Sequence, residues 1–134
     1  MQTHSQRRIK SLKPPNPSEH AEQAHLVTWW GYECKRLGVP ERLLFAIPNG
    51  GERHPAVAAK LKAEGVRPGI PDLFLSVGRG GYHGLYVEMK SLTTYPTANQ
   101  KDAHTLLRRA GYRVEVCQGA DAAKQTITAY LEAA

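Results

Sequence analysis

Residues 69–90 read GIPDLFLSVGRGGYHGLYVEMK, and this stretch decides the fold. Two apolar runs, 73–77 and 85–90, flank a glycine-rich segment at 78–81, a pattern typical of two antiparallel strands joined by a turn. Side chains alternate between the two faces of a strand. One face of the expected hairpin is therefore apolar and belongs to the core, and its members are Leu73, Leu75, Val77, Leu85, Val87 and Met89.

The opposite face of this hairpin collects charged side chains. Asp72 comes from the first strand, and Tyr86, Glu88 and Lys90 come from the second. Removing a charge from water costs free energy, so charges on a mostly buried hairpin need partners or a function. The carboxylates of Asp72 and Glu88, with the backbone carbonyl of Met89 between them, are the hard oxygen ligands that Mg²⁺ prefers.

Two interpretations of this charged face remain open. In the first, the face is a metal site for phosphodiester hydrolysis, in which Lys90 orients or deprotonates the attacking water and offsets phosphate charge. In the second, it is a surface hairpin with a salt-bridge cluster that contributes little stability. The Asp…Glu-x-Lys pattern is short enough to arise by chance, so the rest of the chain has to decide.

Length and charge bound the possible functions. The chain has 134 residues and 41% hydrophobic content, which suits one domain with one core. A formal net charge of +6 suits a polyanionic partner. Four of the 18 basic side chains precede residue 14, so the rest of the chain is nearly balanced. We expect a disordered basic arm at 1–15 and a single domain at 16–134.

Cysteine usage and hydropathy indicate the compartment. Cys34 and Cys117 match no zinc spacing and are too few for a disulfide scaffold, so free thiols in a reducing cytoplasm are expected. No apolar run approaches membrane-spanning length, and the basic start lacks the hydrophobic region of a signal peptide. We expect a soluble cytoplasmic protein, with no membrane partner and no small-molecule cofactor.

Residues 16–37 have the pattern of an amphipathic helix with Asn16 as its N-cap. Extending its inward stripe back by one turn brings Glu19 and Gln23 near the stripe's centre and Glu22 to its edge. Glu19 also fits a capping box with Asn16, so capping and an active-site role both remain open for this carboxylate. The inward stripe itself consists of Gln23, Leu26, Val27, Trp30, Cys34 and Leu37.

The middle of the chain combines a short strand, a turn and a short helix. The apolar run at 43–47 predicts an interior strand, the segment 48–51 predicts a turn, and a helix is expected at 54–64. Turn chemistry or a solvated surface explains each polar residue here singly, and contact with phosphates is the functional alternative. We assign nucleic-acid contact to Asn49, Gly50, Arg53, Lys60, Lys62, Arg67 and Lys101.

The last third predicts a helix at 97–110, a strand at 112–117 and a helix at 121–131. Thr97 and Gln100 form a capping box, which by itself accounts for the glutamine. The positive end of this helix also comes close to the proposed site. The six histidines show no metal-ligand spacing, and there is no nucleophile elbow, P-loop or dinucleotide fingerprint.

This order of elements is an α/β pattern with a mixed central sheet flanked by helices. Its motifs, over about residues 17–118, resemble those of the VRR-NUC family, the virus-type replication-repair nuclease domain of the PD-(D/E)XK superfamily. The size is similar to that of stand-alone phage and prophage members. The motifs that carry the resemblance are Glu19 and Gln23, Pro48-Asn49-Gly50-Gly51-x-Arg53, Leu61-Lys62-x-x-Gly65, Gly69-x-Pro71-Asp72-Leu73, Glu88-x-Lys90 and Gln100.

The resemblance implies roles for individual residues. Asp72 and Glu88 match the metal-binding carboxylates, Lys90 matches the catalytic lysine, and Glu19 matches the first-helix acid that completes the metal site. Gln100 matches a glutamine beside the catalytic centre, and Gln23 supports the site.

The activity that follows from these roles is that of a DNA endonuclease dependent on Mg²⁺ or Mn²⁺. Small members of the family are similar to junction resolvases that act as homodimers on branched DNA, so four-way (Holliday) junctions and a role in DNA repair are expected. The alternatives are an inactive nucleic-acid-binding module and a flap-specific, end-specific or restriction-type nuclease.

Overall fold

The structure is a computed structural model that describes residues 17–48 and 54–133. Several sequence expectations fall outside the described residues, namely those for the arm at 1–15, Asn16, Asn49, Gly50 and Arg53. In chain order the elements are α2 (Glu19–Glu33), η1 (Glu41–Leu43), β1 (Leu44–Ala46), α3 (Pro55–Ala63), β2 (Leu73–Leu75), β3 (Leu85–Lys90), α4 (Ala98–Arg109), β4 (Arg113–Gln118) and α5 (Ala120–Glu132).

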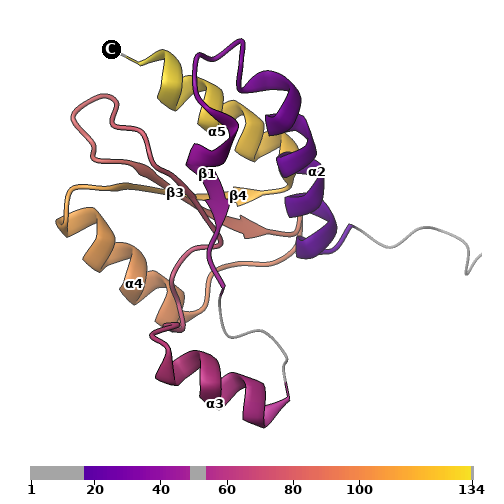
Figure 1. The fold of residues 1–134 in the computed structure, drawn as a ribbon, viewed down its shortest axis with the longest axis vertical. Helices are drawn as coiled ribbons and strands as arrows, with labels where there is room; N and C mark the ends of the chain where they lie inside the picture. Colours follow the sequence, from indigo (N-terminus) through magenta and orange to yellow (C-terminus); the bar gives the residue numbers. More distant parts are fainter. Residues whose placement is uncertain (1–16, 49–53, 134) are drawn as a thin grey trace, which may run out of the picture.

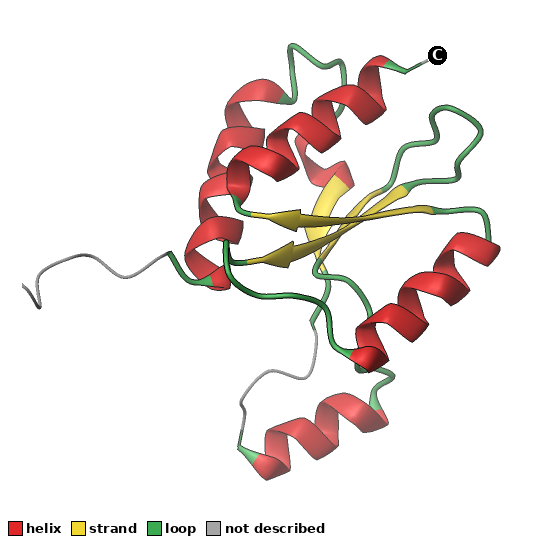
Figure 2. Ribbon diagram, turned by 180° about the vertical axis from the view of Figure 1, so that it is seen from behind, coloured by secondary structure: helices red, strands yellow, loops and turns green. Residues whose placement is uncertain are grey.

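The four strands form one mixed sheet in the order β1-β2-β3-β4. β1, β2 and β3 are antiparallel neighbours, and β4 runs parallel to β3. α2 and α5 lie side by side on one face of the sheet, and α4 lies on the other (Figures 1 and 2). This arrangement confirms the expected α/β class. The prediction that 43–47 forms an interior strand is wrong, because β1 lies at the sheet edge and Phe45 is largely exposed.

The hairpin of β2 and β3 has the predicted alternation. Leu73 pairs with Val87 and Leu75 pairs with Leu85, and all four side chains are buried under α2 and α5. Between the strands the chain turns tightly at residues 80–81, both of which are glycines with positive φ, +58° and +84°. Positive φ at both central positions is the geometry of a type I′ hairpin turn, which explains the adjacent glycines.

The apolar face of α2 packs on this core much as its stripe predicts. Leu26, Trp30 and Cys34 are buried, and Trp30 Nε1 donates a hydrogen bond to the Glu41 carbonyl at 2.8 Å. Val27 departs from the prediction, since it lies towards the edge of the stripe and is 46% exposed. The helix also ends at Glu33, earlier than the stripe suggests.

α3 is the helix least involved in the core. It begins after its N-cap His54, near the predicted position, and none of its residues is buried. Figure 1 shows it apart from the sheet, beyond one end of α4. The chain after α3 then passes very close to α4 at Gly69, where a Cβ atom would lie 2.8 Å from the Asn99 carbonyl oxygen. This close approach explains the glycine.

The described helices include none that is both long and apolar enough to cross a membrane. Cys34 and Cys117 are free thiols and both are buried, as their spacing led us to expect.

Candidate active site

Asp72 and the second half of β3 meet on the sheet face that α4 covers. Asp72 immediately precedes β2, and its Oδ2 accepts a hydrogen bond from the Met89 backbone N–H at 2.7 Å. Glu88 is 1% exposed and Lys90 is 6% exposed. The alternative of a surface hairpin with a solvated salt-bridge cluster is therefore wrong, because two of the three charged groups are removed from water.

Burial and the neighbouring acid change the chemistry of Glu88. The pKa of Glu88 is raised to about 9, first because the carboxyl is buried and then because it forms a hydrogen bond to Asp72 and lies near its charge. Lys90 opposes this effect by favouring the ionised form. Without a bound cation the Glu88 carboxyl group thus keeps its proton at neutral pH and uses it in the hydrogen bond to Asp72. A cation bound at these acids would take the place of that proton.

His104 is a member of the site that the sequence reading missed. It lies on α4, is buried, and its Nε2 is 3.0 Å from Glu88 Oε1. The pKa of His104 is lowered by burial and by the positive charges of Arg108 and Lys90, so the imidazole is neutral near pH 7. The available signal was helical spacing, because His104 follows Gln100 by four residues and faces the same way. A search for metal-ligand spacing among histidines ignores such a histidine–carboxylate pair.

Glu19 reaches this site from the first turn of α2. Its Oε1 lies 3.6 Å from Lys90 Nζ and accepts a hydrogen bond from the Thr94 hydroxyl at 2.9 Å. The expected capping box of Glu19 with Asn16 is wrong. Ser18 is the N-cap, with its Oγ accepting from Ala21 N at 3.0 Å, and Glu19 is the first residue of the helix. Its carboxylate is therefore directed at the end of β3 rather than back at the cap.

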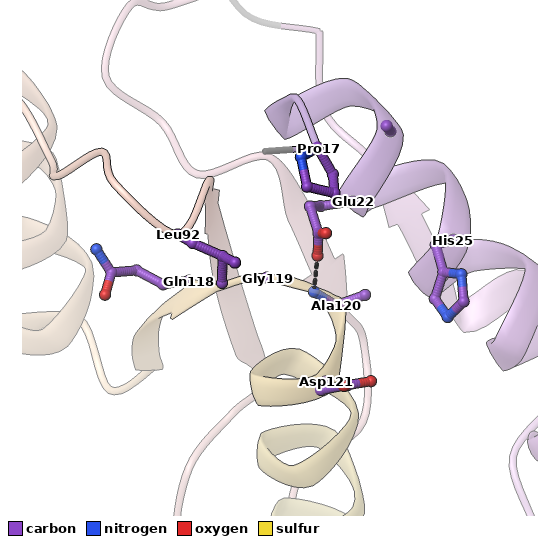
Figure 3. Close-up of a pocket in the computed structure, with 9 residues that line it drawn as sticks. Pro17, Glu22, His25, Leu92, Gln118, Gly119, Ala120 and Asp121 are labelled. Atoms are coloured by element: carbon purple, nitrogen blue, oxygen red, sulfur yellow. Dashed lines mark hydrogen bonds between the residues drawn. The ribbon is translucent and has the colours of Figure 1, made fainter. Parts of the chain in front are cut away.

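Glu22, the competing acid, points elsewhere. Its carboxylate accepts a hydrogen bond from the Ala120 backbone N–H at the start of α5, across a pocket that Pro17, Leu92 and Gln118 also line (Figure 3). α5 has a glycine as its N-cap and so has no capping side chain of its own. Glu22 supplies that cap from another helix and complements the positive end of α5. The geometry separates the two acids, with Glu19 at Lys90 and Glu22 at α5.

The other site residues proposed from the sequence are Gln100, Gln23 and the basic side chains. Gln100 is used as a cap, since its Oε1 accepts from the Thr97 backbone N–H at 2.9 Å and the capping box is complete. This confirms the capping prediction for Gln100. Gln23 is half-buried on α2, one turn after Glu19. The basic side chains assigned to nucleic-acid contact are exposed, as a phosphate-binding surface requires, and they are Lys60, Lys62, Arg67 and Lys101.

The donor set fits a hard divalent cation. Asp72 and Glu88 provide two neighbouring carboxyl groups, and the Met89 carbonyl faces the same side of β3 as the Met89 N–H that bonds Asp72. Over residues 17–48 and 54–133 there is no group of three or more His, Cys, Asp or Glu side chains arranged to hold a metal. An ion held by two carboxyl groups and one carbonyl would keep positions for water and phosphate, as Mg²⁺ commonly does in phosphoryl chemistry.

A mixed α/β core with this arrangement of acids and lysine at one end of its hairpin defines a nuclease-type fold. The sequence matches the family model of the VRR-NUC domain over residues 9–121. A solved structure described as "VRR_NUC domain protein" is similar to this chain, with a TM-score of 0.72 and 31% sequence identity, covering 88% of this chain and 91% of that one. No curated protein matches the sequence. The chain belongs to the VRR-NUC domain family.

Proposed function

We propose that this protein is a DNA endonuclease that requires Mg²⁺ or Mn²⁺ and hydrolyses phosphodiester bonds at the Asp72–Glu88–Lys90 site. The observation that carries the proposal is the burial of Glu88 and Lys90 together beside Asp72 in a VRR-NUC domain. Burying an acid and an amine costs free energy, and groups buried in this way beside a further acid are typical of functional sites.

Each residue has a distinct part in the proposed reaction. Asp72, Glu88 and the Met89 carbonyl would hold the ion, which lowers the pKa of a bound water and polarises the phosphate, and Glu19 would complete the metal site by adding its negative charge beside Lys90. Lys90 Nζ lies 3.6 Å from Glu19 Oε1, where the lysine would orient the attacking water and offset phosphate charge. The buried His104 fixes the Glu88 carboxyl by its hydrogen bond and excludes water from that side.

Branched DNA, in particular the four-way junction, is the proposed substrate, and a homodimer acting in the cytoplasm is the proposed form. One site per chain cuts one strand, whereas resolving a junction takes two symmetric nicks, which a two-fold dimer supplies. Tyr32 on α2 is 82% exposed and Trp29 beside it is half-buried, and aromatic residues are enriched at interfaces. Light scattering of the protein alone and on junction DNA tests the dimer.

The activity is tested with labelled four-way junction, flap, duplex and single-stranded DNA, each with Mg²⁺, Mn²⁺ or EDTA. We expect cleavage only with a divalent ion, fastest on the junction and as paired nicks. Binding of DNA without cleavage under any of these conditions would identify a non-catalytic binding module instead. Cleavage limited to flaps or ends would keep the nuclease and reject the junction preference.

The first-helix acids give a sharper prediction. Glu19→Gln should reduce Mg²⁺-supported cleavage by roughly 10- to 100-fold, because it removes a negative charge from the metal site. Glu22→Gln should leave the cleavage rate near that of the wild type, because the amide oxygen can still accept the Ala120 N–H. Rates under single-turnover conditions compare the two, and a larger loss in Glu22→Gln would show that the wrong acid has been assigned.

A further inference from the structure

The loop that leaves β3 is bonded directly to Glu19. Thr94 Oγ1 lies 2.9 Å from Glu19 Oε1, 2.9 Å from the Ser91 backbone nitrogen and 3.0 Å from Ser91 Oγ. Ser91 follows Lys90 in the chain and is itself buried. Thr94 therefore connects the end of the Glu88-x-Lys90 strand to the first turn of α2.

The direction of these hydrogen bonds follows from the atoms involved. A hydroxyl has one proton to donate and two lone pairs with which to accept. Thr94 Oγ1 accepts from the Ser91 N–H and from the Ser91 hydroxyl, so its own proton goes to Glu19. An ionised carboxylate can only accept. The Ser91–Thr94–Glu19 chain thus fixes the position of the Glu19 carboxyl oxygen that accepts this bond.

The rest of Thr94 is held as well. Gln118, the last residue of β4, donates from Nε2 to the Thr94 carbonyl oxygen at 2.8 Å. Ser91 Oγ accepts from the Thr93 backbone N–H at 3.4 Å, which closes the turn. Thr94 is consequently held at two points, by Ser91 at its hydroxyl and by Gln118 at its carbonyl oxygen. The Glu19 side chain, in contrast, is 46% exposed.

We propose that Thr94 is a positioning residue, which holds the Glu19 carboxylate towards Lys90 and the metal site. This inference rests on the proposed function and deepens it. The Thr94 hydroxyl supplies an orienting hydrogen bond to an acid on a half-exposed side chain, and partners of this kind set metal affinity in many sites. Thr94 is thereby part of the site rather than of a simple connection.

The test measures Mn²⁺ binding without DNA, by electron paramagnetic resonance of the free ion. Thr94→Val keeps the shape of the side chain and removes its proton donor, and we expect about tenfold weaker binding, the lower end of the range for such partners. Thr94→Ser retains the hydroxyl and should bind Mn²⁺ like the wild type. Thr93→Val removes a hydroxyl one position away and should also bind like the wild type.

A double-mutant comparison shows whether Thr94 acts on Mn²⁺ affinity through Glu19. In a Glu19→Gln background, Thr94→Val should have no further effect on Mn²⁺ affinity, because the carboxylate that it positions is gone. In DNA cleavage, Thr94→Val should raise the Mn²⁺ concentration for half-maximal rate and leave KM for DNA unchanged. If Thr94→Val still lowers Mn²⁺ affinity in the Glu19→Gln background, or if Thr94→Ser lowers it as well, the role of Thr94 is merely structural and the inference is overturned.

The failure of this inference differs from the failure of the proposed function. Wild-type protein that binds Mn²⁺ and cuts DNA, together with a Thr94→Val variant that does both equally well, would overturn the role of Thr94 alone. Wild-type protein that neither binds Mn²⁺ nor cuts DNA would overturn the proposed function and this inference together.

Discussion

Asp72→Asn is expected to lower the single-turnover rate of DNA cleavage by roughly 10³-fold, while folding and DNA binding stay close to wild type. The asparagine side chain keeps an oxygen that can accept the Met89 N–H, so the hairpin is retained. It loses the negative charge that a divalent ion requires, and transition-state stabilisation by such an ion amounts to several kcal/mol, or about three powers of ten in rate. Asp102→Asn, at an exposed position of α4, is the matched control and should cut normally.

Lys90→Met tests the contribution of the lysine amine to the same site. Methionine fills most of the space of the buried lysine and removes only the charged end, so the fold should survive. We expect a loss of rate similar to that of Asp72→Asn, with the metal requirement unchanged. A well-folded Asp72→Asn or Lys90→Met variant that cuts at near the wild-type rate would contradict the assignment of this site.

Glu88→Gln is expected to stabilise the metal-free protein at neutral pH. The pKa of Glu88 is about 9 in the folded chain, against an ordinary value of 4.5. Between these values the folded state holds a proton that the unfolded state has released, so the free energy of unfolding falls as pH rises. The contribution is fully present below about pH 4.5 and is lost as pH rises through about 9. Glutamine has no such proton, and its amide can still donate to Asp72.

The size of this effect follows from the same linkage. At pH 7 the cost to the wild type is on the order of 3 kcal/mol, which the glutamine variant should avoid. Urea unfolding in EDTA at pH 5, 7 and 8.5 measures it, with Glu132→Gln at an exposed position as the control. The gap in the free energy of unfolding between Glu88→Gln and wild type should widen as pH rises. A constant gap, or a wild type that gains stability towards pH 8.5, would show that Glu88 is not held protonated.

The part of the site that lies on the hairpin could be predicted from the sequence. Strand alternation is strict, so it placed Asp72, Glu88 and Lys90 on one face opposite an apolar face. Helical spacing similarly directed Glu19 inward, although the cap of its helix was misassigned to Asn16. Ser18 is an equally good N-cap by type, and the local sequence does not decide between the two.

The features that depend on tertiary contacts could not be predicted in the same way. His104 meets Glu88 only because α4 packs on the second face of β3, and nothing local marks that histidine as buried. Glu22 caps a helix almost a hundred residues further along the chain. The position of β1 at the sheet edge follows from strand order, which the apolar run at 43–47 does not encode.

Crystals soaked in Mn²⁺ and measured for anomalous scattering test the central claim most directly. We predict a peak between the Asp72 and Glu88 carboxylates, within about 2 Å of an oxygen from each and of the Met89 carbonyl. The peak should be absent in Asp72→Asn crystals soaked in the same way. A protein that cuts DNA with Mn²⁺ yet binds the ion away from these carboxylates would contradict the account.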